Sequence, residues 1–270
     1  WNQPVYMQPK LDGVRCIFTS NGAFSRTGKR FMNVKHIESA LQEMFKQNPW
    51  LILDGELYNH DLRDDFEKII SLVRKQKPTD DDRKEARKMI QYHVYDYAFC
   101  NPNENKVDLI ESDMNRYKKR MNQLACSDMY GKHIKYVPSK RVATPAMSKV
   151  IHQSFLDEGY EGSIMRLDGA YKNGRSYDLM KFKDFSDTEA KIIGWVEGKG
   201  KRRGTIGKFI AIDSEGIKFG MPVMDEFKKL RRDFKLMQTW VGLIATFTYF
   251  ERTKANSYRH PLFKAIRNYE

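Results

Sequence analysis

The sequence predicts an α+β protein of two domains, a large mixed domain at residues 1–186 and a small all-β domain at residues 187–270. This prediction depends on a change of pattern along the chain. As far as residue 186, segments whose apolar residues recur at helical spacing alternate with short β-prone segments, whereas the later segments are nearly all short and strand-like. A length of 270 residues also leaves each domain enough chain to bury its own core.

The first half of the large domain is expected to open with two strands and a helix. The strands lie at residues 5–8 and 14–20, on either side of a tight corner that holds Lys10, and a turn follows them. Asn33 is expected to cap the helix, whose apolar residues recur as far as Phe45. The further elements predicted here are a buried strand at 51–57, a helix that begins near Phe66 and stops near Pro78, a charged loop at 79–83 and a strand at 92–99.

The second half of the large domain is expected to contain two more helices. One starts at Ser112 or Asp113. The other starts at Thr144-Pro145, because Thr144 can cap it and Pro145 fits its first turn, and it ends at Gly159. Three strands complete this domain, at residues 134–138, 162–167 and 178–182, the last two joined by a turn at Asn173-Gly174.

The small domain is predicted from short strands and a single helix near residues 225–234. The strand-like segments lie at residues 190–196, 205–212, 216–219 and 243–250. Such a series of short strands is typical of a small Greek-key barrel.

The composition describes a soluble globular protein with a polyanionic partner. A formal net charge of +13 is a large excess for this length and favours nucleic acid as that partner. No apolar run is long enough to span a bilayer, so we expect no membrane association. The cysteines, at positions 16, 100 and 126, are too scattered for a disulfide framework or a zinc site. A reducing compartment is therefore expected, either the cytoplasm or, in a eukaryotic host or virus, the nucleus.

Six short motifs occur in the first 183 residues, and the first is Lys10-Leu11-Asp12-Gly13-Val14-Arg15. The others are Ser25-Arg26-Thr27-Gly28, Leu53-Asp54-Gly55-Glu56-Leu57, Val94-Tyr95-Asp96, Glu161-Gly162-Ser163-Ile164-Met165-Arg166 and Met180-Lys181-Phe182-Lys183. Together, and in this order, they resemble the motifs of the covalent nucleotidyltransferases, which include DNA ligases, RNA ligases and mRNA capping enzymes. The resemblance implies a nucleotidyltransferase (adenylation) domain of mixed antiparallel sheets and helices, followed by a small OB-fold β-barrel.

The resemblance also implies a role for each matching residue. Lys10 would be the nucleophile that takes up AMP, with Glu161, Lys181 and Lys183 as further catalytic residues. The nucleotide would be bound by Gln8 at the adenine edge, Tyr95 on the adenine face, Glu56 at the ribose and Arg15. Arg26 would bind the 5′-phosphate of the DNA, because a guanidinium suits bidentate phosphate recognition.

Elementary chemistry gives the same residues a purpose. Lysine attacks phosphorus only as a neutral amine, and an ordinary lysine pKa of about 10.4 leaves little of it neutral at pH 7. Cationic neighbours lower that pKa, so Lys181, Lys183 and a bound Mg²⁺ (or Mn²⁺) would activate Lys10 and also stabilise the phosphates. Oxygen ligands suit such an ion, and Glu56 and Glu161 are the candidates.

The small domain carries two more segments that resemble DNA ligases. Residues 197–204 form a glycine-rich basic stretch whose expected DNA-binding side chains are Lys199, Lys201, Arg202 and Arg203. The segment at 259–267 resembles one more motif, which the family numbers as its sixth and which closes over the β- and γ-phosphates of ATP. Arg259, Lys264 and Arg267 are the candidates for binding these phosphates. The family commonly continues with an Asp-Lys pair, whereas this chain reads Asn268-Tyr269-Glu270. That difference leaves open which residue orients the pyrophosphate.

The function predicted from the sequence is that of an ATP-dependent DNA ligase, a monomer that seals 5′-phosphate/3′-hydroxyl nicks in double-stranded DNA. The second domain is expected to swing about a hinge at residues 184–187. An RNA ligase or a capping guanylyltransferase shares the first motifs and is the alternative enzyme. A non-catalytic nucleic-acid-binding module is the alternative from another class, although intact Lys10, Glu56 and Glu161 argue against it.

Overall fold

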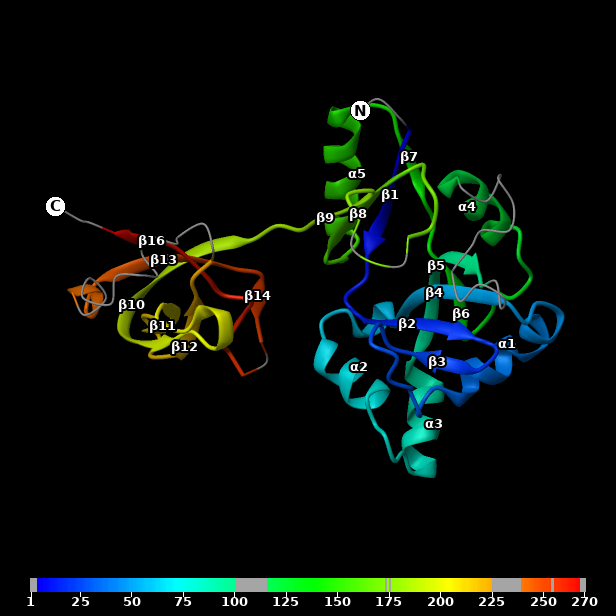
Figure 1. The fold of residues 1–270 in the computed structure, drawn as a ribbon, viewed down its shortest axis with the longest axis horizontal. Coiled ribbons are helices and arrows are strands. Elements are labelled where there is room, and N and C mark those ends of the chain that lie inside the picture. The colour runs from blue at the N-terminus through cyan, green and yellow to red at the C-terminus, as the bar shows by residue number, and fades with distance from the viewer. Residues whose placement is uncertain are drawn as a thin grey trace. The chain divides into compact units, whose positions relative to one another are not determined.

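A computed structural model of the chain describes residues 4–100, 116–172, 174, 176–224, 239–253 and 255–267. The chain divides into two compact units, Trp1–Lys183 and Asp184–Glu270 (Figure 1). The division therefore falls between residues 183 and 184, slightly ahead of the boundary at 186/187 that the sequence suggested. Each unit has its own apolar core.

The first unit contains a four-stranded antiparallel sheet in the order β7-β1-β8-β9. One helix, α5 (Pro145–Asp157), packs on β7, β1 and β8 of this sheet (Figure 1). Apolar side chains from both layers form a small core, including Val5, Met7 and Phe155. The strands are β1 (Val5–Lys10), β7 (Lys140–Val142), β8 (Gly162–Leu167) and β9 (Leu179–Phe182).

The second sheet of this unit has five strands in the order β3-β2-β4-β5-β6, with only β5 and β6 parallel. Its strands are β2 (Val14–Thr19), β3 (Gly22–Phe24), β4 (Leu51–Tyr58), β5 (Gln91–Phe99) and β6 (Ile134–Tyr136). Its helices are α1 (Lys35–Gln47), the 3₁₀ turn η1 (His60–Leu62), α2 (Phe66–Val73), α3 (Asp80–Met89) and α4 (Tyr117–Ala125). Fully buried Phe18 and Tyr92 pack edge to face at the centre of its core.

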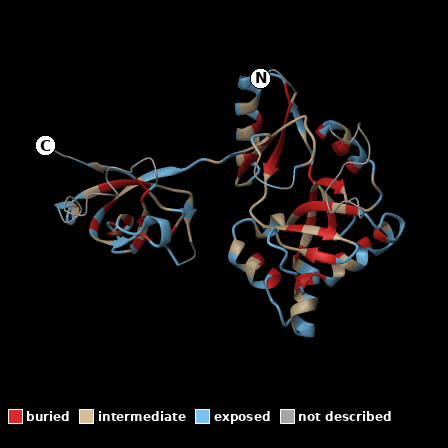
Figure 2. Ribbon diagram, viewed as in Figure 1, coloured by how far each residue is buried: buried red, intermediate tan, exposed pale blue. Residues whose placement is uncertain are grey.

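The second unit is an antiparallel β-sheet region, as the strand-rich pattern predicted. Five strands pair in the order β12-β11-β10-β13-β16, and β14 and β15 form a separate hairpin. Buried Phe219, Phe247 and Tyr258 pack against one another in its core. The ribbon coloured by burial shows buried segments in both units (Figure 2). The elements are β10 (Ser186–Glu197), η3 (Gly200–Arg202), β11 (Ile206–Ile212), β12 (Lys218–Pro222), β13 (Ile244–Tyr249), β14 (Glu251–Arg252), β15 (Tyr258–Arg259) and β16 (Leu262–Arg267).

Two local predictions were wrong. The charged segment 79–83 is not a loop, because Thr79 caps α3. The Thr79 hydroxyl accepts from the Asp82 N–H, and the Asp82 carboxylate accepts from the Thr79 N–H. Asn33 does not cap α1. Its Nδ2 donates to the carbonyls of Leu72 and Asp82, and Val34 is the N-cap residue without a side-chain hydrogen bond.

Some predicted features lie outside the described residues. They are the helix start at Ser112 or Asp113, Asn173 of the predicted turn, the helix near 225–234 and residues 268–270. Within the described ranges, no helix is long and apolar enough to cross a membrane.

Candidate active site

Three strand ends bring the predicted catalytic side chains together. Lys10 is the last residue of β1 and pairs with Gly162, the first residue of β8. The backbone N–H of Glu161 donates to the Lys10 carbonyl at 3.2 Å. Lys183 follows directly after β9, whose Phe182 pairs with Ser163. The register of β1, β8 and β9 therefore places residues 10, 161 and 183 at the same end of these three neighbouring strands.

Lys10, Glu161 and Lys183, hereafter the Lys10 group, are joined by ion pairs. The Nζ of Lys10 contacts Oε2 of Glu161, and the Nζ of Lys183 lies 3.0 Å from Oε1 of the same carboxylate. All three side chains are largely buried, with Glu161 only 4 % exposed. One carboxylate shared by two ammonium groups leaves the group with a net positive charge.

The surroundings of Lys10 weaken its ammonium form. Burial, then the charge of Lys183 and also that of Lys181, lower the pKa of Lys10 to about 8, against the opposing effects of Asp12 and Glu56. The Glu161 carboxylate stabilises the ammonium, so its contact holds Lys10 protonated. At a pKa near 8, about a tenth of the side chain is neutral at pH 7.

Two motif glycines allow the strands to approach this closely. A Cβ on Gly162 would lie 2.2 Å from the Phe182 carbonyl oxygen, and its φ of +151° is one that other residues rarely adopt. A Cβ on Gly13 would lie 2.8 Å from Cγ of Glu56. Both glycines are thus required by close packing around the Lys10 group.

Glu56 is a half-buried carboxyl group, and few interactions offset the cost of burying its charge. Burial raises its pKa to about 8, and Asp54 adds to this effect, while Lys10, Arg15 and Lys181 oppose it. Its side chain accepts no hydrogen bond that the described part of the chain shows. A cation in contact with Glu56 would stabilise its ionised form.

Arg15 is fixed by a bidentate ion pair. Its Nε and Nη2 donate to the two oxygens of the buried Asp54 at 2.9 and 2.6 Å, and the Tyr171 hydroxyl donates to the same carboxylate at 2.9 Å. Burial works against the charge of Arg15, but Asp54 outweighs it and raises the pKa further. Tyr171 was not identified from the sequence, because it belongs to none of the motifs.

Gln8 contacts Tyr95 by a hydrogen bond from its side chain to the Tyr95 backbone carbonyl. The buried Gln8 donates from Nε2 to the carbonyl of Val137 at 3.0 Å and to that of Tyr95 at 3.5 Å. Both bonds use the amide nitrogen, so the orientation of the amide is set and Oε1 faces away from these carbonyls. The half-buried ring of Tyr95 has the guanidinium carbon of Arg166 at 5.3 Å from its centroid.

Metal ligands were predicted at Glu56 and Glu161. Among the residues that the structure describes, no cluster of three or more histidine, cysteine, aspartate or glutamate side chains could hold a metal ion. Two carboxylates beside Lys10 are a donor set of hard oxygens, and substrate and water oxygens would have to complete any coordination shell.

Comparison with known proteins identifies the family. A family model described as the ATP dependent DNA ligase domain matches residues 1–183. The chain belongs to this ATP-dependent DNA ligase family. The DNA ligases of Enterobacteria phages T6 and T4 are 26 % and 23 % identical to it in alignments of 237 and 227 positions, and each alignment covers 71 % of this chain. The chain spans about half, 46 %, of the length of these two relatives.

Solved DNA ligase structures have the same fold. A Lig E DNA ligase, described as binding DNA with a minimal scaffold, superposes with a TM-score of 0.75 at 21 % identity, over 97 % of this chain and 92 % of that one. A structure named Pmar-Lig_PreS3 gives a TM-score of 0.77 at 24 % identity, over 98 % and 64 %. The bacteriophage T7 ATP-dependent DNA ligase in complex with ATP gives 0.55 at 19 %, over 98 % and 93 %.

The remaining residues predicted from the ligase motifs lie at the surface or in the second unit. Arg26 is exposed in a tight turn, where the Gly28 N–H donates to the Ser25 carbonyl at 2.9 Å. The basic side chains of residues 199, 201, 202 and 203 are exposed around η3. The three sixth-motif cations form ion pairs inside the second unit, Arg259 with Glu251, Lys264 with Asp187 and Arg267 with Glu189.

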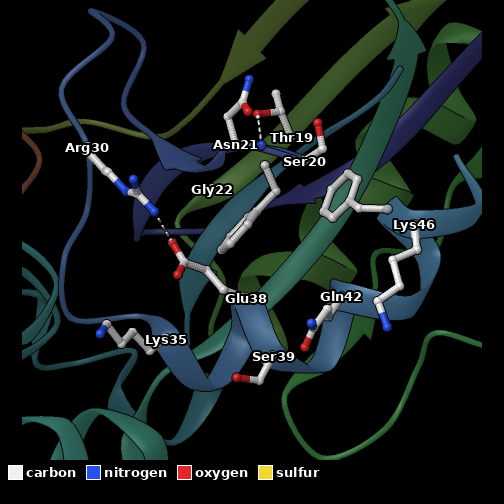
Figure 3. Close-up of a pocket in the computed structure, with 12 residues that line it drawn as sticks. Thr19, Ser20, Asn21, Gly22, Arg30, Lys35, Glu38, Ser39, Gln42 and Lys46 are labelled. Atoms are coloured by element: carbon white, nitrogen blue, oxygen red, sulfur yellow. Dashed lines mark hydrogen bonds and ion pairs between the residues drawn. The ribbon is translucent and has the colours of Figure 1, made fainter. Parts of the chain in front are cut away.

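A separate surface hollow of about 480 Å³ lies between the β2–β3 hairpin and α1 (Figure 3). Arg30 and Glu38 form an ion pair of 3.6 Å across it. No residue of the Lys10 group lines it. The candidate active site is therefore indicated by the motifs and the strand register, and this hollow is a separate feature.

Proposed function

We propose that this member of the ligase family is an ATP-dependent DNA ligase that seals nicks in double-stranded DNA through an AMP group carried on Lys10. The observation that carries the proposal is the Lys10 group, in which the nucleophile of the first motif contacts Glu161 of a later motif, with Lys183 on the same carboxylate. Membership of the family supports the assignment.

The reaction consists of three phosphoryl transfers. Lys10 attacks the α-phosphorus of ATP, so that a P–N bond forms and the P–O bond to pyrophosphate breaks. An oxygen of the 5′-phosphate at the nick then attacks the AMP phosphorus, so that a P–O–P linkage forms and the P–N bond to Lys10 breaks. Finally the adjacent 3′-hydroxyl attacks the 5′-phosphorus, expels AMP and joins the strand. Such transfers depend on alignment and charge stabilisation.

The residues around Lys10 would supply both requirements. The proton on Lys10 can leave to Glu161, whose carboxylate already contacts the ammonium. Lys183 and Lys181 would increase the fraction of neutral amine and stabilise charge on the α-phosphate, since both lower the pKa of Lys10. A single cluster of cations would thus activate the nucleophile and bind the group that it attacks.

Glu56 and Glu161 fit a divalent cation of the Mg²⁺ or Mn²⁺ kind. Glu56 is a desolvated carboxyl without a hydrogen bond in the described residues, and Glu161 is its neighbour at Lys10. A bound cation would supply charge stabilisation to the phosphate oxygens.

Gln8 would select adenine over guanine. Because its Nε2 is committed to two backbone carbonyls, only Oε1 is available to a base, and an oxygen can only accept. Adenine presents an exocyclic amino donor where guanine presents an oxygen acceptor. Tyr95 would stack on the base, with Arg166 against its ring. Arg15 and Glu56 would contact the ribose and phosphate.

The DNA would be bound by Arg26 and by the basic residues around η3.

We further propose that the second unit is a closed OB-fold barrel. The two outer strands of its five-stranded sheet, β12 and β16, lie close to each other, which supports closure. Movement at residues 184–187 would let this unit act first on ATP and later on DNA. Its three paired cations, Arg259, Lys264 and Arg267, would then exchange carboxylate for phosphate. We propose a monomer at DNA in the cytoplasm or nucleus.

Covalent labelling tests this function. Incubated with ATP radiolabelled at the α-phosphate, the protein should retain one label, which Lys10→Ala should lose completely while Lys46→Ala, on the surface of α1, keeps it. Labelling by GTP instead of ATP would indicate a capping enzyme, and sealing of nicked RNA alone would indicate an RNA ligase. Persistent labelling of Lys10→Ala would refute the proposal.

A further inference from the structure

A second pocket, hereafter the α1–α3 pocket, lies where the start of α1 meets α3. Its volume is about 270 Å³. From α1 and the residue before its cap it is lined by Asn33, Lys35, His36 and Ser39. From α3 it is lined by Arg83, Lys84 and Arg87. No carboxylate belongs to this lining, and no residue is shared with the Lys10 group.

The start of α1 adds uncapped backbone donors to this pocket. Val34 occupies the N-cap position and provides no side-chain hydrogen bond. The N–H groups of Ile37 and Glu38 donate to the Val34 carbonyl, and no hydrogen bond among the described residues uses those of Lys35 and His36, at the positive end of the helix dipole. Lys35 and Ser39 also line the neighbouring hollow, and Figure 3 shows both side chains on the outer face of α1. Such a helix start is suited to an anion only where other groups converge on it.

Two buried polar atoms in the lining lack partners. Nη1 of Arg83 is buried and donates to no acceptor in the described part of the chain. Oδ1 of Asn33, a residue only 1 % exposed, accepts from no donor there. The bonds from Nδ2 of Asn33 to Leu72 and Asp82 prevent the amide from turning round. The pocket thus offers an arginine donor and one fixed acceptor, both unsatisfied, and such atoms are costly to bury.

The charge of the pocket is strongly positive. Lys84 pairs with Asp81 at 3.0 Å, but both side chains are more than three-quarters exposed, so the pair is weak. Arg83 lies 3.9 Å from Asp80, which is 95 % exposed. Burial lowers the pKa of His36 to about 4, so His36 is neutral. Three cations of α3 and Lys35 of α1 therefore determine the charge.

We propose that the α1–α3 pocket binds inorganic phosphate or the phosphate of a small monoester, in a form that still carries a P–OH group. The cations and the helix start bind the charged oxygens, and the P–OH donates to Asn33. A phosphodiester of the DNA backbone has no such hydroxyl. The volume lies below the range of about 300–1,000 Å³ usual for larger ligands, which favours a small oxyanion. This site is independent of the ligase function.

The test compares two lysines of the same helix. Lys84 lines the pocket, and Lys88 is exposed one turn later and does not. Titration calorimetry with inorganic phosphate at pH 7 and constant ionic strength should give at least fivefold weaker binding for Lys84→Gln, and likewise for Arg87→Gln. Lys88→Gln should change the affinity less than twofold. Sulfate, which has no proton at this pH, should bind at least tenfold more weakly than phosphate to the unchanged protein.

Each opposite result overturns the inference. Equal affinities for sulfate and phosphate would remove the role of Asn33, and equal effects of Lys84→Gln and Lys88→Gln would show non-specific attraction to a basic surface. A selective loss of nicked-DNA binding in Lys84→Gln, with phosphate binding intact, would assign the pocket to DNA. Lys10→Ala should bind phosphate at this pocket as the unchanged protein does, so failure of the ligase proposal would leave this one standing.

Discussion

At the scale of single residues, the ionisation of Lys10 determines when the proposed chemistry can begin. Its ammonium is held by Glu161, but burial and Lys183 bring the pKa down to about 8. The neutral, reactive amine increases as the pH rises. We therefore expect the single-turnover rate of lysine adenylylation to increase tenfold per pH unit below about pH 8 and to level off above it.

A control separates this effect from general pH sensitivity. Sealing of a nick that already carries AMP needs no neutral Lys10, so its rate should lack the inflection near pH 8. Lys183→Gln should move the inflection of the adenylylation profile upward, since Lys183 lowers the pKa of Lys10. An unmoved profile in that variant would contradict the proposed activation.

Glu56 should show the opposing demands of stability and function. Because burial raises its pKa to about 8 in the folded state, the stability that it contributes is complete at low pH and is lost as the pH rises from its unfolded value toward 8. Glu56→Gln should therefore raise the free energy of unfolding by about 1–3 kcal/mol at pH 7 and by much less at pH 4. It should also lose most ligase activity.

Chemical denaturation at the two pH values measures this change. Glu43→Gln, on the exposed side of α1, serves as the control, with an expected change of less than about 0.5 kcal/mol. Equal stability of Glu56→Gln and the unchanged protein at pH 7 would show that interactions in the folded state already offset the cost of burying the Glu56 carboxylate.

Some residues of the candidate site could be predicted from the sequence, and others could not. Lys10, Glu161 and Lys183 were identified because their residue types occur in ordered motifs, and the strand register brings them together. The pairing of Tyr171 with Asp54 could not be predicted, because it depends on how a loop after β8 returns to β4. The use of both Gln8 donors by backbone carbonyls is likewise a matter of three-dimensional packing.

At the scale of elements, the helices and strands marked by a clear period or by local cap and turn residues were predicted, whereas α3 and β7 were not. α5 begins at the predicted Thr144-Pro145, because a cap and a proline mark it locally. α3 was missed, since it is charged along most of its length and only Ala86 is buried. β7 is only three residues long, too short for a period to appear.

The cap of α3 should therefore carry much of that helix's stability. Thr79 accepts from the Asp82 N–H, and Asp82 accepts from the Thr79 N–H. Thr79→Ala should lower the free energy of unfolding by about 1 kcal/mol, measured by chemical denaturation. Thr79→Ser keeps the accepting hydroxyl and should remain within about 0.5 kcal/mol of the unchanged protein. A similar loss in both variants would mean that the threonine methyl group matters rather than the hydroxyl.

At the scale of the whole molecule, the net charge of +13 favours association with nicked DNA, and the basic side chains around η3 should determine how the affinity depends on salt. If the four basic side chains around η3 each neutralise one phosphate, the logarithm of the affinity falls with the logarithm of salt concentration with a slope of about −3.6 from these contacts alone. Raising the salt from about 50 to 200 mM should then weaken binding by about 100-fold. Fluorescence anisotropy with a labelled nicked duplex measures this dependence.

Single replacements show whether those side chains are responsible. Lys201→Gln should make the slope shallower by about 0.9, because one counterion fewer is released from the DNA on binding. Lys46→Gln, on α1, removes the same charge from the first unit instead of the second and should leave the slope nearly unchanged. If both variants reduced the slope equally, the attraction would come from the charge of the molecule as a whole, and the basic residues at η3 would have no special role in DNA binding.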